Sequence, residues 1–344
     1  MPVAFGLEMA AVGSSRLDVA TGVQSSPQID GKATAGLTKS TDVTSSESTS
    51  ENANESKSQS RSQVGTAAAL PYVAAEKIRE YAKHAKLKLR SHVALLFDER
   101  DNEVIFQRNA KQVMPVASLS KLMTAMVILD ARLPMDEVIT INKADKDRIR
   151  YSKSRFRKGM KFRRDDLLLI ALVASENRAA LALARTYPGG STQFVKAMNH
   201  KAHELGLVKT HFSDAAGLAN DNVSTANELL QIVKAASTYA EIREFTTQTR
   251  ESITDLNTGR EVKFGNTNRL VKLDSWPITL SKTGFTHDAG NCLVMQTEIN
   301  ERPVIIVLLD SWGKLSKYGD SNRIKKWLIK TERKVIKHNK SEAI

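Results

Sequence analysis

Two groups of predicted β-strands, one before and one after a long helical segment, constrain the fold of this chain most strongly. Short runs rich in β-branched and aromatic residues, bounded by turn-forming residues, predict strands at 91–97, 103–107, 278–280, 292–298 and 304–309. The first two enclose a polar, turn-rich segment and are expected to form a hairpin. Because strands must pair to satisfy their backbone groups, both groups are expected to meet in one sheet.

The residues between and beside these strands show the apolar spacing of amphipathic helices. Asp165 and Asp166 suit a helix N-terminus, and Thr225 followed by Glu228 matches a capping box. Helices are predicted at 74–85, 119–131, 164–174, 193–205, 225–236 and 321–337. This order of elements indicates an α+β chain in which helices are inserted between two parts of one sheet.

The N-terminal part of the chain has a different composition. Residues 40–62 contain nine Ser and only two apolar residues, which is too little apolar surface to offset the entropy of ordering. We interpret residues 1–70 as a disordered, low-complexity region. Met1–Gly13 is apolar but contains Glu8, and no Lys or Arg precedes Arg16, so it lacks the pattern of a secretory signal. A different start site or retention in the cytoplasm would each explain this.

Two further features exclude classes of protein. The longest unbroken apolar run, Leu167–Ala174, has eight residues, whereas a membrane-spanning helix needs about 20. Cys292 is the only Cys, so neither an intrachain disulfide nor a Cys-based zinc site is expected. The sequence therefore predicts a chain without a membrane span, and we expect no metal or other cofactor.

Positive charge is the main compositional signal, with 51 Lys and Arg against 38 Asp and Glu. Eleven of the cations lie in residues 143–164 beside two Asp, and nine lie in 316–344 beside three acids. Such segments are either solvated surface or attract a polyanion, which could be nucleic acid, anionic lipid or a cell-wall polymer. Phe156 and Phe162 are too sparse for a base-stacking surface, so we do not expect nucleic acid.

The first motif with chemical meaning is S-x-x-K, formed by Ser118 and Lys121 at the start of a predicted helix. Residues three apart share one helical face, so the amine can reach the hydroxyl. A Ser hydroxyl needs a base to become a nucleophile, and a Lys can serve if burial or nearby positive charge lowers its pKa. The motif is weak alone, since Ser311 and Lys314 repeat it in a context that does not favour a catalytic helix.

Two more motifs follow in the chain. Ser175 and Asn177 form S-x-N directly after an apolar helix, although both residue types are also common in ordinary turns. Residues 282–284 form K-T-G at the end of the strand predicted at 278–280. There Gly284 would let the strand backbone approach a ligand closely. Each motif has an ordinary structural interpretation, but their order and their contexts together are far more specific.

The three motifs resemble those of β-lactamases and penicillin-binding proteins. Residues 86–335 are most similar to low-molecular-weight penicillin-binding proteins of the D-alanyl-D-alanine carboxypeptidase/endopeptidase family. The stretches that carry the resemblance are Pro115–Ala125, Ala174–Ala180, Asn266–Asn268, Leu280–Phe285 and Ala289–Met295. The resemblance implies a β-lactamase/transpeptidase-like fold, in which an antiparallel sheet is flanked by helices and carries an inserted helical subdomain. It also implies a catalytic domain at 86–337, followed by a basic tail at 338–344.

The resemblance implies a role for each motif residue. Ser118 would attack the carbonyl of the penultimate D-Ala of a peptidoglycan stem peptide, and Lys121 would be its base. Ser175 would relay a proton to the leaving amine, and Asn177 would hold both Lys121 and the substrate amide. Penicillin would form a covalent adduct at the same Ser118.

The strand motif completes the implied site. Lys282 would keep the site positive, which favours a neutral Lys121 and attracts an anionic substrate. Thr283 and Gly284 would contact the substrate, with Thr283 binding its carboxylate. The backbone N–H groups of Ser118 and Phe285 would form the oxyanion hole.

The resemblance leaves the exact reaction open. Only 34 residues follow Asp310, which favours an endopeptidase that cuts the D-Ala–diaminopimelate cross-link over a carboxypeptidase that removes terminal D-Ala. A β-lactamase would need an acidic residue to activate the deacylating water, and none is evident. An inactive cell-wall-binding module is the alternative of another class. A periplasmic or envelope location is expected, with possible contacts to anionic envelope polymers.

Overall fold

The computed structural model describes residues 71–83 and 86–342. The low-complexity region predicted at 1–70 and the last two residues of the predicted basic tail lie outside the described residues. No helix within these two ranges is long and apolar enough to cross a bilayer.

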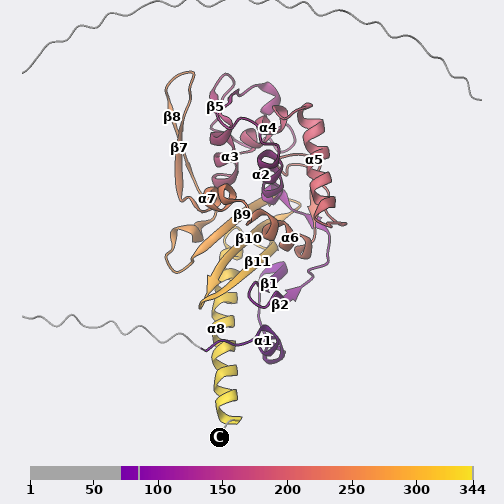
Figure 1. Cartoon of the computed structure of the whole chain (residues 1–344), viewed down its shortest axis with the longest axis vertical. Helices are drawn as coiled ribbons and strands as arrows, with labels where there is room; N and C mark the ends of the chain where they lie inside the picture. The colour runs from indigo at the N-terminus through magenta and orange to yellow at the C-terminus, as the bar shows by residue number, and fades with distance from the viewer. Residues whose placement is uncertain (1–70, 84–85, 343–344) are drawn as a thin grey trace, which may run out of the picture. The chain divides into compact units, whose positions relative to one another are not determined.

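A five-stranded antiparallel sheet forms the centre of the fold (Figure 1). Its strand order is β2-β1-β11-β10-β9, so the N-terminal hairpin pairs with the C-terminal strands through β1 and β11. The strands span β1 Ser91–Asp98, β2 Glu103–Arg108, β9 Ile278–Thr286, β10 Gly290–Ile299 and β11 Arg302–Ser311. This arrangement confirms the sheet and the α+β fold predicted from the sequence.

Each face of the sheet is covered by a separate apolar core. Along β1, Val93, Leu95 and Phe97 belong to one core, whereas Ala94 and Leu96 belong to the other. This alternation follows from the pleat of a strand, which sends successive side chains to opposite faces. Helices α1 (Ala75–Ala82) and α8 (Ser316–Glu342) pack on the second core, and the inserted helices pack on the first.

The inserted part is mainly helical. Eight of the ten residues of α2 are buried, and all of these except Lys121 and Thr124 are apolar, so this helix lies in the middle of its neighbours (Figure 1). Three two-stranded ribbons join the helices: β3 with β6, β4 with β5, and β7 with β8. The helices span α2 Lys121–Asp130, α3 Arg164–Val173, α4 Asn177–Arg185, α5 Gly190–Glu204, α6 Ala226–Ala236 and α7 Ala240–Thr247. The ribbons span β3 Met114–Pro115, β4 Val138–Thr140, β5 Lys161–Arg163, β6 Val223–Ser224, β7 Arg250–Thr254 and β8 Glu261–Gly265, with 3₁₀ turns η1 Ala117–Ser120, η2 Lys143–Asp145 and η3 Arg269–Lys272.

Three local expectations differ from the structure. The K-T-G residues lie inside β9 rather than at its end, because β9 continues to Thr286 in register with β10. Helix α8 begins at Ser316 and runs through most of the predicted basic tail to Glu342. The capping box of α6 is half formed, since Thr225 accepts from the Glu228 N–H but the Glu228 carboxylate bonds the Lys209 N–H and the Thr210 hydroxyl instead.

Candidate active site

The first site element is the turn that precedes α2. Ser118 lies in the 3₁₀ turn η1, and Lys121 is the first residue of α2. Ser118 is half-buried, whereas Lys121 is 1% exposed. The Lys121 Nζ atom lies 2.9 Å from the Ser118 Oγ atom, so the structure brings the two residues together as the sequence predicted.

Burial shifts the Lys121 amine towards its neutral form. Burial lowers the pKa of Lys121 to about 7, against the opposing effects of the Asp214, Glu176 and Asp147 carboxylates. Besides Ser118, the amine contacts the Asn177 Oδ1 atom at 2.7 Å and the Ala216 carbonyl oxygen at 2.6 Å.

These contacts determine where the lone pair of a neutral amine points. The Asn177 and Ala216 oxygens can only accept, so they take the two N–H groups of a neutral Lys121. The remaining lone pair faces the Ser118 hydroxyl, which can donate. The Ser118 hydroxyl also lies 3.3 Å from the Ala216 oxygen, a longer contact than that to Lys121.

The loop that presents Ala216 was not identified from the sequence. The Asp214 carboxylate accepts hydrogen bonds from the backbone N–H groups of Ala216, Leu218 and Ala219 and thereby fixes the turn. Gly217 has a φ of +74°, and a Cβ there would lie 2.0 Å from the Ala117 carbonyl oxygen. An Asp followed three residues later by Gly is a turn signal that the sequence contained.

The S-x-N residues lie at the junction of α3 and α4. Asn177 is the first residue of α4; its Nδ2 group donates to the Ser152 Oγ atom at 2.9 Å while its Oδ1 atom accepts from Lys121. Ser175 is half-buried and has a φ of 57°, a left-handed conformation unusual for a non-glycine residue. Within the described residues, no hydrogen bond joins Ser175 to Ser118 or Lys121.

Strand β9 forms the opposite wall. Gly284 lies against the turn that carries the nucleophile candidate, since a Cβ at 284 would be 3.0 Å from the Val116 carbonyl oxygen and 3.2 Å from the Ser118 backbone nitrogen. The requirement for Gly is therefore close packing of two backbones. Phe285, the next residue, is 57% exposed beside this contact.

The other K-T-G residues are buried. Lys282 is 1% exposed, and its amine donates to the Thr283 carbonyl oxygen at 3.2 Å. Burial lowers the pKa of Lys282 well below its usual range, and the nearby Lys121 and Lys317 lower it further. The Thr283 hydroxyl donates to the Thr267 hydroxyl at 2.7 Å. Thr267 belongs to the Asn266–Asn268 stretch, which the sequence analysis quoted without assigning a role.

The acidic side chains near the site hold backbone segments in place. Among residues 71–83 and 86–342, no group of three or more His, Cys, Asp or Glu side chains is placed to hold a metal ion. Asp147 binds the backbone N–H groups of Ile149, Arg150 and Ser152. The arrangement of Ser118, Lys121 and Asn177 offers a candidate nucleophile and a candidate base within hydrogen-bond distance of each other.

Comparison of the chain with known proteins identifies its family. The family model described as D-alanyl-D-alanine carboxypeptidase, peptidase S11, matches residues 79–313. A D-alanyl-D-alanine endopeptidase of Pseudomonas aeruginosa is 44% identical over 241 residues, which cover 70% of this chain and 78% of that protein. A D-alanyl-D-alanine endopeptidase of Escherichia coli is 42% identical over 262 residues, which cover 76% and 84%.

The fold is also that of a solved relative. Penicillin-binding protein D2 of Listeria monocytogenes, in its ampicillin-bound form, is 30% identical with a TM-score of 0.61, over 71% of this chain and 99% of that one. The transpeptidase-like fold expected from the resemblance is thereby confirmed. The chain belongs to the D-alanyl-D-alanine carboxypeptidase family, S11, of serine D,D-peptidases.

Proposed function

We propose that this protein is a peptidoglycan D,D-endopeptidase that cuts D-Ala–diaminopimelate cross-links through an acyl-enzyme at Ser118. The observation that carries the proposal is the 2.9 Å contact between Lys121 Nζ and Ser118 Oγ, with both N–H groups of a neutral amine taken by other acceptors. An amine held in this way accepts the hydroxyl proton as the oxygen attacks.

Acylation starts when Lys121 takes the proton of Ser118 and the Oγ atom attacks the carbonyl carbon of the penultimate D-Ala. The negative charge that develops on the carbonyl oxygen is held by the N–H groups of Ser118 and Phe285, each worth about 2.7–4 kcal/mol in such sites. The peptide C–N bond then breaks, and the leaving amine receives the proton from Lys121 through Ser175. Asn177 keeps Lys121 in place during both transfers.

Deacylation reverses the roles with water as the nucleophile. Lys121, neutral again after the first half-reaction, takes a proton from water, and the hydroxide formed attacks the ester carbonyl. The C–O bond to Ser118 breaks, and its oxygen recovers a proton from Lys121. The products are a free D-Ala carboxylate and the intact enzyme, so no redox partner is needed.

Substrate binding is assigned to the K-T-G strand. The buried Lys282 amine has no carboxylate ion-pair partner among the described residues, so the carboxylate of a bound substrate would stabilise its charged form. Thr283 and Gly284 lie on the same strand, where the Thr283 hydroxyl can turn from Thr267 towards a ligand. Penicillin, which carries a carboxylate and a reactive carbonyl, is expected to acylate Ser118 in the same orientation.

The preference for cross-links rests on the two relatives named endopeptidases, at 44% and 42% identity. A carboxypeptidase that removes terminal D-Ala is the alternative. Digestion of purified cross-linked muropeptide dimers, with products identified by mass, separates the two. Conversion of dimer to monomer supports the proposal, whereas shortening of pentapeptide to tetrapeptide with the dimer intact contradicts it. Because its substrate is the cell wall, we propose that the protein acts in the periplasm or cell envelope.

A further inference from the structure

The surface segment 143–158 exposes seven cations. Lys143, Lys146 and Arg148 lie in its first part, and Lys153, Arg155, Arg157 and Lys158 in its second. Within the described residues, no Asp or Glu forms a salt bridge with any of these seven side chains. Their charges therefore lack an acidic partner, and Arg155 alone of them lies over an aromatic ring, with its Cζ atom 5.4 Å from the centroid of Phe264.

The two acids of this segment are both used inside the protein. Asp145 is 1% exposed and pairs with the Arg185 guanidinium at 2.7 and 3.1 Å. Asp147 is 2% exposed and accepts from three backbone N–H groups of the segment itself. Neither carboxylate neutralises the outer surface, so the segment is more cationic outside than its composition indicates.

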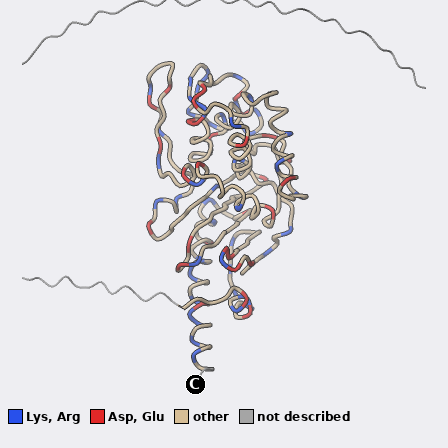
Figure 2. Tube along the Cα trace, viewed as in Figure 1, with Lys and Arg blue, Asp and Glu red and all other residues tan. Residues whose placement is uncertain are grey.

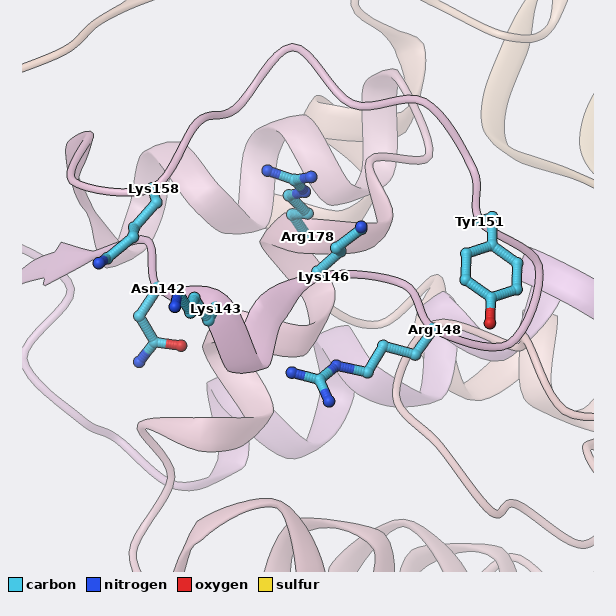
Figure 3. A pocket seen from close by; sticks show the side chains of 7 residues that line it. All are labelled: Asn142, Lys143, Lys146, Arg148, Tyr151, Lys158 and Arg178. Carbon is cyan, nitrogen blue, oxygen red and sulfur yellow. The ribbon is translucent and has the colours of Figure 1, made fainter.

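Part of this cationic surface encloses a cleft of about 560 Å³. Figure 3 shows the side chains that line it, which include Lys143, Lys146, Arg148, Lys158 and Arg178 together with Tyr151. Of the residues that the structure describes, no Asp or Glu lines the cleft. Arg178 is anchored by a hydrogen bond from Nη1 to the Phe156 carbonyl oxygen at 2.6 Å, while its buried Nε group has no partner in the described structure.

The cleft adjoins the catalytic site through two pairs of neighbouring residues. Tyr151 is 73% exposed with a φ of 54°, and the next residue, Ser152, accepts the Asn177 amide. Arg178 follows Asn177 at the start of α4. A bulky residue with positive φ is a backbone outlier, and here it sends the ring outward while the next side chain supports the site.

We propose that this cleft binds carboxylates of the peptidoglycan stem peptides that neighbour the one being cut. The inference rests on the proposed function. Stem peptides attached to the same glycan are held near the site by the bound substrate, so even weak contacts act at high effective concentration. Unpaired ammonium and guanidinium groups suit carboxylates, and salt should weaken the contact. The cleft would thus make the enzyme favour intact wall over isolated fragments.

The test uses Ser118→Ala protein, which cannot cut the wall, and measures its retention on purified sacculi by sedimentation. Adding Lys146→Gln, Arg148→Gln and Lys158→Gln should weaken retention about fivefold. The matched control adds Lys330→Gln, Lys334→Gln and Lys337→Gln on α8, whose cations are also exposed and numerous (Figure 2), and should change retention less than about twofold. An equal loss of retention in the cleft variant and the α8 variant would contradict a specific site and indicate diffuse charge attraction. No loss of retention in the cleft variant would also contradict the proposal.

A second arm identifies the anion. Sacculi whose carboxyl groups have been amidated should retain the cleft variant and its parent equally. A difference that survives amidation would show that the ligand is not a carboxylate and would overturn the proposal. Retention is measured without turnover, so the outcome of the retention test does not depend on the outcome of the muropeptide digestion that tests the proposed function. Penicillin labelling of each triple variant with Ser118 intact confirms that its active site is folded.

Discussion

Lys121 and Asn177 are joined by a hydrogen bond of 2.7 Å between Nζ and Oδ1, although 56 positions separate them in the chain. This bond, with that from Lys121 to the Ala216 carbonyl, leaves one direction open on a neutral amine, and Ser118 occupies it. The position of the base is therefore set by residues from three separate segments.

Removing the nucleophile or the base should separate activity from folding. Ser118→Ala should abolish labelling by a fluorescent penicillin, because no acyl-enzyme can form. Lys121→Ala should slow labelling by at least about a hundredfold, because the hydroxyl loses its base. Circular dichroism should show native structure in both. Labelling of either variant at the parent rate would refute the assigned role.

The rate of acylation should depend on pH through Lys121. Its pKa of about 7 means that the amine is protonated below this pH and cannot accept a proton, so the rate should rise as pH passes through about 7 and then level off. Stopped-flow measurement of kcat/KM between pH 5 and 9 reports this group in the free enzyme. A rate that stays flat across this range would contradict a buried, neutral base.

The low pKa of Lys121 also predicts the sign of a stability change. An unfolded Lys titrates near 10.4, so between pH 7 and about 10 the unfolded chain binds the extra proton and the folded one does not. The contribution of this group to stability should therefore increase with pH in that window. Chemical denaturation of the parent protein and of Lys121→Met at several pH values isolates the contribution of Lys121 to stability. The same pH dependence in both proteins would contradict the lowered pKa of Lys121.

A methyl group at position 284 should push β9 away from the catalytic turn. Gly284→Ala would place its Cβ 3.0–3.2 Å from Val116 and Ser118 backbone atoms, so we expect acylation to fall about tenfold and the free energy of unfolding by about 1–3 kcal/mol. Gly265→Ala is the matched control, since no atom of residues 71–83 or 86–342 lies within 4 Å of a Cβ built there. Equal acylation rates in the two variants would show that the close approach is unimportant.

Substitution of Gly217 should destabilise the protein for two reasons, backbone strain and a steric clash, which a control variant can separate. Gly217→Ala combines a φ of +74° with a contact of 2.0 Å to the Ala117 oxygen, so the loop that presents Ala216 must move. Gly206→Ala has a similar φ of +71° but no neighbour of its Cβ within 4 Å among the described residues, so its free energy of unfolding should fall by only about 1 kcal/mol. The thermal midpoint and the rate of penicillin labelling are compared for the two variants. Equal losses would mean that the effect of Gly217→Ala comes from backbone strain and not from the clash with Ala117.

The strands and the motif residues could be read from the sequence because their signals are local. The alternation of β1 side chains between the two cores and the largely apolar character of α2 follow from side-chain order alone. The position of K-T-G inside β9 could not, since Thr283 to Thr286 extend the strand only because β10 is there to pair with them. The second half of the capping box of α6 was wrongly predicted for a similar reason, because the Glu228 carboxylate accepts a hydrogen bond from the Lys209 N–H in another segment.

The sequence by itself determined the chemical groups, the order of the central strands and the family, because a Ser, a Lys and a Gly at fixed spacing restrict the local backbone and its chemistry. It did not predict helices α4 and α7 or the two-stranded ribbons. Only the tertiary structure decided that Ala216 and Ser152 take part, and that the Lys121 amine is buried enough for its pKa to fall to about 7. The physical reason is that desolvation and hydrogen-bond geometry depend on atoms from remote segments, which a one-dimensional pattern does not bring together.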